Sequence, residues 1–323
     1  MFPYWHQVTP GKKYNVLMTY TKESVHRFLQ DSSYREISNI TPASGGDWSQ
    51  VFFFEAGGNS KVIRFSQANE DFLKDQFAYR FNSPNLPIPE IEEIGQAFDG
   101  YYAVSPRVDG DMVDRLPRDK MTRLVPQILS LFNALRTVEL SDTTGYGNWN
   151  TEGKGTSNSW REFLTSVNQY DPTSRVDWRV GLANRPDTQV LFDRVYQEMS
   201  KLLKYCPEER HLIHNDLLHL NLITKNDQVV GVIDWGCSLY GDFLYDLAMF
   251  DLWQFYYPSM EGIDWKGEAK QHFAVAGVDM INFAERLKCY QCHLALDAIK
   301  YSVFKNNDKN LALITGRIKE IIH

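Results

Sequence analysis

The sequence predicts an α+β protein in two parts: a small, largely antiparallel β-sheet carrying one helix, followed by a larger, mainly helical part. Short β-type runs alternate with helical patterns in the first third of the chain, and long helical patterns dominate after residue 106. We therefore expect an N-terminal lobe at residues 1–106 and a C-terminal lobe at residues 107–323. With 323 residues, 43% of them hydrophobic, the chain can bury a substantial core.

The N-terminal lobe combines four short β-type runs with helical patterns. The runs "VFFFEA" and "KVIRFS" are joined by "GGN", and "IEEIGQAF" and "YYAVSPRV" are joined by Asp99-Gly100. Both connections are typical of β-hairpins. Helical patterns precede the first hairpin at "SVHRFLQ" and follow it at "NEDFLKDQFAYRF". Two hairpins with a helix between them predict the small antiparallel sheet.

Long helical patterns dominate the C-terminal lobe, at residues 121–140 and 187–205. Between them, "TTGYGNWNTEGKGTSNSW" is rich in Gly, Asn and Ser, and we expect it to be a surface excursion. Further on, "NLIT" and "VVGVID" are joined by "KNDQ", which predicts another hairpin inside the helical lobe.

Two cysteines allow two interpretations, because "CYQCH" matches the C-x-x-C-H pattern of covalent haem attachment. The surrounding "FAERLKCYQCHLALDAIKYSVF" has apolar residues at helical spacing, which favours two thiols within an amphipathic helix. The chain has only four cysteines, too few for disulfide bonds to stabilise a protein of this length, and we expect them to be reduced.

The charge balance limits the classes of partner. A formal net charge of -7, with no run of five or more Lys and Arg, gives no attraction for nucleic acid, whereas a cationic small molecule is easier to accommodate. The N-terminus lacks the pattern of a secretory signal, and no segment approaches 18 uninterrupted apolar residues. We therefore expect a cytoplasmic protein without a membrane or nucleic-acid partner, and no obligate protein partner is evident.

The most informative stretch is "HLIHNDLLHLNLITKNDQVVGVIDWG", which contains the predicted hairpin of the C-terminal lobe. Asp216 lies in the loop before the first strand, Asn221 at its start and Asp234 at the end of the second strand. The start of one antiparallel strand lies beside the end of the next, so Asn221 and Asp234 should be neighbours. Two oxygen ligands, one ionised, suit Mg²⁺, which keeps waters and substrate phosphates as its other ligands.

The alternative is a purely structural role, in which Asp216, Asn221 and Asp234 serve as turn and capping residues. Against it, the spacing His-x-Asp-x4-Asn-x12-Asp, beginning at His214, resembles the catalytic loop and metal-binding turn of the protein kinase superfamily. The predicted loop, strand, turn and strand also provide the expected context, so we favour the kinase-like interpretation.

Further motifs resemble the aminoglycoside phosphotransferase family, most closely its hygromycin B phosphotransferase-like branch. They are "IDWG", "GDFLYDLA", "NLPIPEIEEIG", "GYG" and "CPEERHLIHND", and the resemblance extends from about residue 40 to 255. It implies a two-lobed protein-kinase-like fold with ATP between the lobes. It also implies that Asp216 deprotonates the substrate hydroxyl, that His214 braces the loop, and that Asn221 and Asp234 hold Mg²⁺. Asp242 and Asp246 more readily organise the following helix than touch substrate.

The nucleotide lobe departs from the kinase pattern in several places. Arg64 stands at the usual lysine position, and Asp75 is its expected partner on the following helix, although an unrelated surface contact is the alternative. Lys61 falls on the opposite face of the strand. The phosphate-covering loop would be "SGGDWS", although a plain hairpin turn is the other interpretation. The cofactor-binding residues in that loop would be Ser44, Gly45 and Gly46.

Backbone groups around Ser105 to Val108 would hold the adenine, as the resemblance implies, with Ser105 and Arg107 as nucleotide-binding residues. The catalytic loop also departs from the family, since "HND" replaces the usual "HGD" and His219-Leu220 replaces a common Pro-Gly. These changes keep the ligand types but affect the shape of the loop backbone.

The acceptor would bind to the helical lobe, where "DLAMFDLWQFYYPSMEGIDW" supplies Asp251, Trp253 and Glu261. Carboxylates with aromatic faces suit a polyamine sugar, although a helix with core aromatics and a solvated acidic face is an equal alternative. The favoured hypothesis is an ATP- and Mg²⁺-dependent O-phosphotransferase acting on an aminoglycoside-type antibiotic. A kinase for another amino alcohol or sugar, or a silent kinase-like nucleotide-binding module, remain alternatives.

Overall fold

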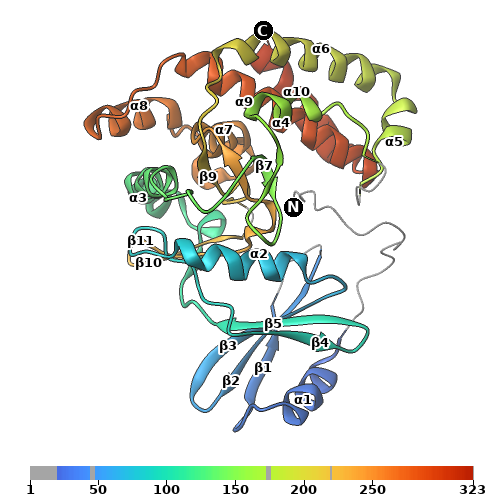
Figure 1. The fold of residues 1–323 in the computed structure, drawn as a ribbon, viewed down its shortest axis with the longest axis vertical. Helices are drawn as coiled ribbons and strands as arrows, with labels where there is room; N and C mark the ends of the chain where they lie inside the picture. Colours follow the sequence, from blue (N-terminus) through green and yellow to red (C-terminus); the bar gives the residue numbers. More distant parts are fainter. Residues whose placement is uncertain (1–19, 44–47, 172–175, 219, 323) are drawn as a thin grey trace.

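A computed structural model describes residues 20–43, 48–171, 176–218 and 220–322 of the chain. A β-sheet from the N-terminal third lies at one end of the molecule, and most of the helices lie at the other (Figure 1). Helix α2 (Glu70–Ala78) runs between the sheet and the helical region. The α+β architecture predicted from the sequence is confirmed.

Within the described residues, the N-terminal sheet has five strands in the order β1-β2-β3-β5-β4, with antiparallel neighbours throughout. The strands are β1 (Ser38–Pro42), β2 (Gln50–Ala56), β3 (Asn59–Ser66), β4 (Glu93–Ala97) and β5 (Gly100–Pro106). Both predicted hairpins are confirmed. Gly57 and Gly58 of the first turn have φ values of 54° and 77°, as a tight primed turn requires. Strand β1 was not predicted, because its sequence, "SNITP", carries a weak β pattern.

Each face of this sheet is covered by a helix. Val25 and Leu29 of α1 (Lys22–Asp31) pack with the large apolar side chains on one face. Phe72 of α2 packs on the other face, against alternate residues of the same strands. The sheet therefore carries a helix at α1 in addition to the one between the hairpins, and both of its apolar faces are buried.

The C-terminal region is built around helices that bury large apolar side chains. The α-helices are α3 (Arg118–Arg136), α4 (Trp160–Ser166), α5 (Arg179–Ala183), α6 (Pro186–Leu202), α7 (Leu244–Trp253), α8 (Trp265–Val275), α9 (Phe283–Phe304) and α10 (Asp308–Ile322). Short 3-10 turns are η1 (Tyr79–Phe81), η2 (Val113–Arg115), η3 (Leu203–Tyr205), η4 (Trp235–Cys237), η5 (Gln254–Tyr256) and η6 (Pro258–Met260). Cys289 and Cys292 are buried in α9, as the helical interpretation of their segment predicts.

The Gly-rich stretch at residues 143–160 is not the surface excursion that we expected. It forms β7 (Tyr146–Trp149) and β8 (Gly155–Ser157), which join β12 (Leu239–Gly241) and β9 (His211–Ile213) in the sheet order β8-β7-β12-β9. Trp149 and Trp160 are only 2% and 0% exposed. The prediction was wrong because β12, the strand that pairs with β7, comes from much later in the sequence.

The predicted hairpin of the C-terminal lobe is confirmed as β10 (Leu222–Lys225) and β11 (Gln228–Val232), with β6 (Asp111–Met112) on its outer edge. Asn226 and Asp227 form its turn with φ values of 52° and 57°. These are the left-handed conformations that a two-residue primed turn needs, and Asn and Asp tolerate them.

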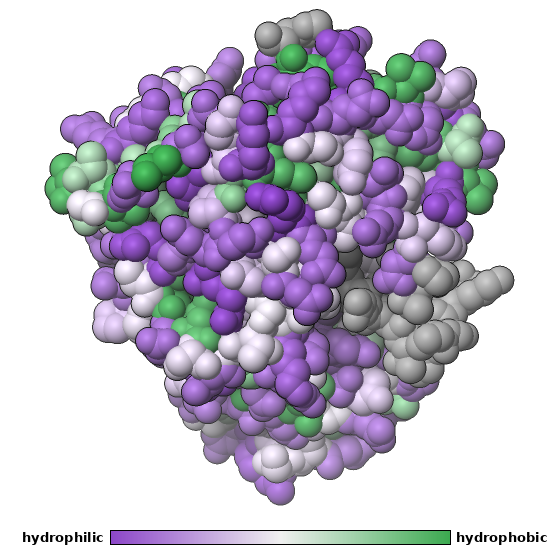
Figure 2. Space-filling model, turned by 45° about the horizontal axis from the view of Figure 1, so that its top comes forward, coloured by the Kyte–Doolittle hydropathy of each residue, from purple (hydrophilic) through white to green (hydrophobic). Residues whose placement is uncertain are grey.

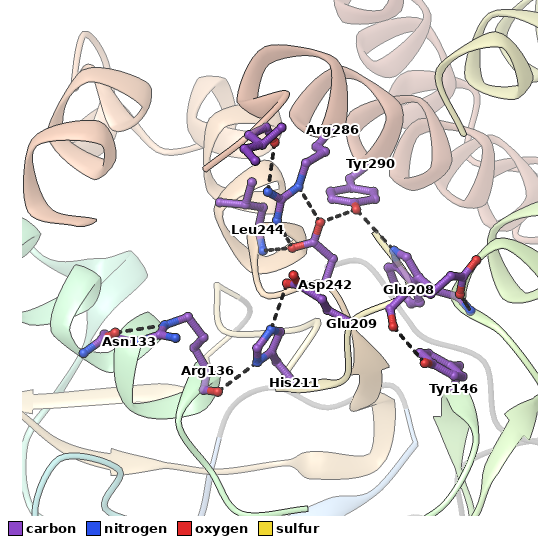
Figure 3. A network of polar contacts seen from close by, with 12 residues as sticks. Asn133, Arg136, Tyr146, Glu208, Glu209, His211, Asp242, Leu244, Arg286 and Tyr290 are labelled. Atoms are coloured by element: carbon purple, nitrogen blue, oxygen red, sulfur yellow. Dashed lines mark hydrogen bonds and ion pairs between the residues drawn. The ribbon is translucent and has the colours of Figure 1, made fainter. Parts of the chain in front are cut away.

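Asp242 is the centre of a buried polar network that ties α7 to α9 (Figure 3). Its carboxylate accepts hydrogen bonds from Arg286 Nε at 2.8 Å and Nη2 at 2.6 Å, from the Tyr290 hydroxyl, and from the backbone N–H of Leu244 at 3.1 Å. Tyr290 in turn accepts a bond from Trp160 Nε1 at 3.3 Å. Asp242 therefore organises the start of α7, as expected.

Hydrophilic side chains predominate on the face shown in Figure 2, where hydrophobic side chains form small, scattered groups. Among the described residues, every helix is too short or too polar to cross a lipid bilayer.

Replacing Arg286 with Met should destabilise the fold by about 3–5 kcal/mol, because it leaves the Asp242 carboxylate buried without its charge partner. Urea unfolding followed by tryptophan fluorescence measures the loss. Lys201→Met is the control, since it breaks an exposed Lys201–Glu198 pair and should leave the midpoint nearly unchanged. Equal midpoints for the two variants would contradict this account of the network.

Candidate active site

The loop at residues 214–221 connects β9 to β10 and is held by His214. The imidazole Nε2 donates to the Ile233 carbonyl at 3.0 Å, and Nδ1 accepts from the Asp216 backbone N–H at 3.2 Å. Burial lowers the pKa of His214 to about 3. A neutral ring fits this arrangement, because a proton on Nδ1 would face the N–H of Asp216. His214 thus braces the loop in a defined tautomer.

Asp246 of α7 anchors the start of the same loop through hydrogen bonds to its backbone. Its carboxylate accepts from the backbone N–H groups of His214 at 2.9 Å and Asn215 at 2.7 Å. Burial raises the pKa of Asp246 to about 7, although these two hydrogen bonds act in the opposite direction. We expected Asp246 to organise its own helix. Its contacts instead fix the backbone of a loop that lies more than thirty residues earlier.

Asp216 and Asn221 face one another across the loop. Asn221 Nδ2 donates to the Asp216 carboxylate at 2.9 Å and to its backbone carbonyl at 2.8 Å. Asp216 is only 7% exposed, and burial, followed by repulsion from Asp234, raises the pKa of its carboxyl well above the usual value. The side chain is therefore poised as a proton acceptor of increased basicity.

The hairpin brings Asp234 next to Asn221, as its register predicts. Leu222 pairs with Val232, and the Ile233 N–H donates to the Asn221 carbonyl at 3.0 Å. Asp234 follows with a φ of 63°, a left-handed conformation that is strained for most residues. Burial and then repulsion from Asp75 raise the pKa of Asp234 to about 7.

Arg64 and Asp75 form the ion pair that the sequence predicts, between β3 and α2. The Arg64 guanidinium also lies over the Phe72 ring at 5.0 Å. Burial opposes its charge, but Asp75 and then Asp234 raise the pKa of Arg64. The other carboxylate oxygen of Asp75 accepts from the Trp235 N–H at 2.6 Å. Lys61 pairs with Glu92 at 2.5 Å, consistent with its predicted place on the opposite face.

A cavity of about 270 Å³ lies between the N-terminal sheet and the β10–β11 hairpin, and we call it the hairpin cavity. Arg64 and Asp75 line one side of it, and Asn221 and Asp234 line the other. Its apolar walls come from both regions of the chain, and include Val62, Ile91, Met112, Ile223 and Ile233. A cavity with apolar walls and the Arg64 guanidinium suits an apolar ring that carries an anionic group.

Two other predicted nucleotide-binding residues, Ser105 and Arg107, also line the hairpin cavity. The Arg107 guanidinium stacks over the Phe53 ring at 4.0 Å. The remaining candidates, Ser44, Gly45 and Gly46, lie outside the described residues, as does His219 of the loop.

Asn221 and Asp234 have the chemistry to hold a hard cation. Because Asn221 Nδ2 binds Asp216, its amide oxygen is the atom left to face a metal. A cation beside Asp234 would offset the repulsion that raises the pKa of this carboxyl. Among the described residues, no group of three or more His, Cys, Asp and Glu side chains is arranged to hold a metal. An amide oxygen and a carboxylate are donors that Mg²⁺ accepts, and Mg²⁺ can bind through two protein ligands and take its other oxygens from water and a substrate.

The residues expected to bind the acceptor do not form a site. Asp251 and Trp253 are 3% and 2% exposed, inside α7. Asp251 accepts from Gln291 Nε2 at 2.5 Å and lies 3.4 Å from Lys266 Nζ. This part of the prediction was wrong, because α9 contacts Asp251 through Gln291, and the Trp253 ring packs against Phe255 and Tyr256. Glu261 is exposed and lies outside both the hairpin cavity and α7.

Lys74 is a residue that the sequence analysis missed. It is buried in α2, donates to the Gly236 carbonyl at 2.6 Å and lies 4.5 Å from the centre of the Trp149 ring. Burial lowers its pKa to about 8. A signal was present, because Lys74 occupies the apolar stripe of an amphipathic helix, four residues before the buried Ala78.

The stability contribution of His214 should be lost as the pH falls below about 6.5. Its folded-state pKa of about 3 lies below the unfolded value, so the unfolded chain binds the extra proton in this window. The free energy of unfolding of the wild type should therefore fall more steeply than that of His214→Gln between pH 6 and 4, by up to about 1.4 kcal/mol per pH unit. Parallel slopes in urea titrations would contradict a neutral, buried His214.

Comparison with known proteins places this geometry in a family. A family model described as the phosphotransferase enzyme family matches residues 39–259. Hygromycin-B 4-O-kinase of Escherichia coli is 29% identical over 304 residues, which span 94% of this chain and 85% of that protein.

Solved structures agree with this comparison. A thermostable mutant of an aminoglycoside phosphotransferase, in a ternary complex with AMP-PNP and hygromycin B, aligns with a TM-score of 0.82 and 29% identity. The alignment covers 93% of this chain and 98% of that one. A spectinomycin phosphotransferase shares the fold, with a TM-score of 0.60 at 13% identity over 92% of this chain and 93% of its own. The chain belongs to the phosphotransferase enzyme family, as an enzyme with the family's kinase-like fold.

Proposed function

We propose that this enzyme transfers the γ-phosphate of ATP to a hydroxyl group of a small molecule, in a reaction that depends on Mg²⁺, and that an aminoglycoside-type antibiotic such as hygromycin B is the acceptor. The observation that carries the proposal is that Asn221, Asp234 and Arg64 line one cavity, and that Asn221 also donates a hydrogen bond to the carboxylate of Asp216. The names of the relatives support the choice of acceptor, since one phosphorylates hygromycin B and another binds it beside AMP-PNP.

The hairpin cavity is the proposed nucleotide site. Its apolar walls suit the adenine ring, and the Arg64 guanidinium suits the phosphates through charge-assisted hydrogen bonds. We propose that residues 1–106 form the nucleotide-binding lobe and residues 107–323 the lobe with the catalytic loop and acceptor site. The end of β5 at Pro106 supports this boundary, because the chain leaves the N-terminal sheet there.

Asp216 is the proposed general base. Its carboxylate takes the proton of the acceptor hydroxyl as the hydroxyl oxygen bonds to the γ-phosphorus and the bond to the bridging oxygen of ADP breaks. The raised pKa of Asp216 in the ligand-free protein matches this task. His214 has a positioning role, because it holds the backbone N–H of Asp216 and the carbonyl of Ile233 at once.

Asn221 and Asp234 are the proposed Mg²⁺ ligands. When bound there, the ion would neutralise charge on the nucleotide phosphates. Arg64 adds a second positive charge from the opposite wall, and Asp75 holds the guanidinium in place. Because the transferred phosphoryl group passes through a loose transition state, most of the rate enhancement comes from this positioning and neutralisation.

Asp216→Asn should lower kcat by about 10²- to 10⁴-fold and leave ATP affinity nearly unchanged, because the amide keeps the size of the carboxylate but accepts no proton. The assay is transfer of labelled phosphate from ATP to hygromycin B, other aminoglycosides and small amino alcohols. Label on an amino alcohol alone would redirect the proposal to a housekeeping kinase. Undiminished transfer by the variant would exclude Asp216 as the base.

Asp234→Asn should remove the effect of Mg²⁺ on ATP binding, because one charged ligand is lost while the left-handed backbone is tolerated by Asn. In thermal unfolding of the wild type, ATP at about 100 times its Kd stabilises by about 2.7 kcal/mol, and we expect this gain to require Mg²⁺. Asp227→Asn is the matched control, since Asp227 has a similar φ of 57° on the hairpin turn. The proposed metal site fails if both variants respond to Mg²⁺ as the wild type does.

A further inference from the structure

A second cavity, of about 340 Å³, lies between α2, β7, α4 and α9, and we call it the α9 cavity. This volume lies in the ~300–1,000 Å³ range of small-molecule pockets. Its lining includes Glu70 and Lys74 of α2, Trp149 of β7, Asn215 of the loop, and His293 and Lys300 of α9. It shares no lining residue with the hairpin cavity. Asn215 lines the α9 cavity, whereas Asn221 and Asp234 line the hairpin cavity, so the loop that carries Asp216 contributes residues to both.

Three buried polar atoms of residues that line the α9 cavity have no hydrogen-bond partner within the described part of the chain. They are Glu70 Oε2, Trp149 Nε1 and Asn215 Oδ1. Trp149 is 2% exposed and Asn215 is 6% exposed. A buried polar group without a partner costs about 1–3 kcal/mol, so three such groups around one cavity point to a ligand that satisfies them.

The orientation of Asn215 is fixed by its own contacts. Its Nδ2 donates to the Cys237 carbonyl at 3.2 Å, so Oδ1 is the end of the amide left for a ligand. The residue has a φ of 63°, which Asn tolerates but which glycine adopts more easily. A side chain at this position therefore brings an acceptor atom to the cavity at a cost in backbone strain. Asn215 also immediately precedes Asp216, the proposed base.

The charges around the α9 cavity favour a ligand with cationic or hydroxyl groups. Lys300 is paired with Asp297 at 3.4 Å, and Lys74 is engaged by the Gly236 carbonyl and the Trp149 ring. By contrast, within the described residues, Oε2 of the Glu70 carboxylate is buried and accepts no hydrogen bond. A ligand that fits must therefore donate hydrogen bonds to Glu70 and Asn215 and accept one from Trp149.

We propose that the α9 cavity receives the phosphate acceptor as an aminated, polyhydroxylated ring, held by Asn215, Glu70 and Trp149, an inference that rests on the phosphotransferase function proposed above. Asn215 Oδ1 and Glu70 accept hydrogen bonds from hydroxyl or ammonium groups of the ring, and Trp149 Nε1 donates to one of its oxygens. Asn215 is thus a specificity-determining residue beside the base, and ATP occupies the hairpin cavity, where Asn221 contacts both the cavity and Asp216.

Two variants test this site, each with a matched control. Asn215→Gly keeps the left-handed backbone and removes the amide, and Trp149→Phe removes the indole N–H while keeping an aromatic ring. The controls are Asn282→Gly, at a φ of 55° on the surface, and Trp265→Phe, whose indole N–H is equally buried and without a hydrogen-bond partner among the described residues. Thermal unfolding checks that all four variants are folded.

The probe is hygromycin B, titrated into nucleotide-free protein by calorimetry and used as acceptor in steady-state assays. We expect Asn215→Gly and Trp149→Phe each to raise the Kd and KM for hygromycin B about tenfold, with the KM for ATP changed less than twofold. Glu70→Gln should weaken the binding of hygromycin B more than it weakens the binding of a neutral polyol. Both control variants should match the wild type.

Failure of this site and failure of the proposed function give different results. Wild-type protein that transfers phosphate to hygromycin B, with unchanged KM in both cavity variants, would overturn the α9 cavity as the acceptor site and leave the function intact. Wild-type protein that transfers no phosphate to any acceptor contradicts the function. In that case, the α9 cavity is still supported if the wild type binds hygromycin B and both Asn215→Gly and Trp149→Phe weaken this binding. The cavity is overturned if the wild type does not bind hygromycin B, or if both variants bind it as tightly as the wild type does.

Discussion

The arrangement of the site depends on the carboxylate of Asp75, which is buried between the two regions of the chain. One oxygen pairs with Arg64 on β3, and the other accepts the backbone N–H of Trp235 in the turn that follows Asp234. Lys74, the preceding residue, donates to the Gly236 carbonyl of the same turn. Consecutive side chains of α2 therefore fix both the sheet and the η4 turn, and these contacts set where Asp234 lies relative to Arg64.

The loop at residues 214–221 and the neighbouring Asp234 combine buried carboxyls with strained backbone, both of which cost stability. Asp216, Asp234 and Asp246 are carboxyls whose pKa burial raises, which means that their charged forms are disfavoured in the ligand-free fold. Asn215, Leu220 and Asp234 all have positive φ values between 63° and 66°. Such strain persists only where the surroundings impose it. Here the surroundings are the two hydrogen bonds to Asp246 and the two made by the His214 ring.

The two cavities give the proposed reaction its geometry. The hairpin cavity is lined by Arg64, Asn221 and Asp234, and the α9 cavity by Lys74 and Asn215. Lys74 and Asp75 are adjacent on α2, yet Lys74 lines the α9 cavity and Asp75 lines the hairpin cavity. In the same way, Asn215 lines the α9 cavity and Asn221 lines the hairpin cavity. Asp216 is linked to both cavities, because the preceding residue, Asn215, lines one and its hydrogen-bond partner Asn221 lines the other. A ligand that moves Lys74 would also disturb the turn that carries Asp234, so binding in one cavity should be felt in the other.

The sequence by itself determined the local elements and the turn of the β10–β11 hairpin. Asn226 and Asp227 specify a two-residue turn, and antiparallel pairing from that turn predicts Asn221 near Asp234. The register itself shifts between Ile223 and Thr224, which pairs Leu222 with Val232. Strand alternation likewise placed Arg64, and not Lys61, towards Asp75. Burial and partnership between distant segments were decided only by the tertiary structure. Strand β7 formed within residues 143–160 because β12 pairs with it. Asp251 was buried by contacts with Gln291 of α9 and Lys266 of α8, and Lys74 acquired its role from Gly236. Short-range patterns encode backbone conformation, whereas the environment of a side chain depends on which remote element packs against it.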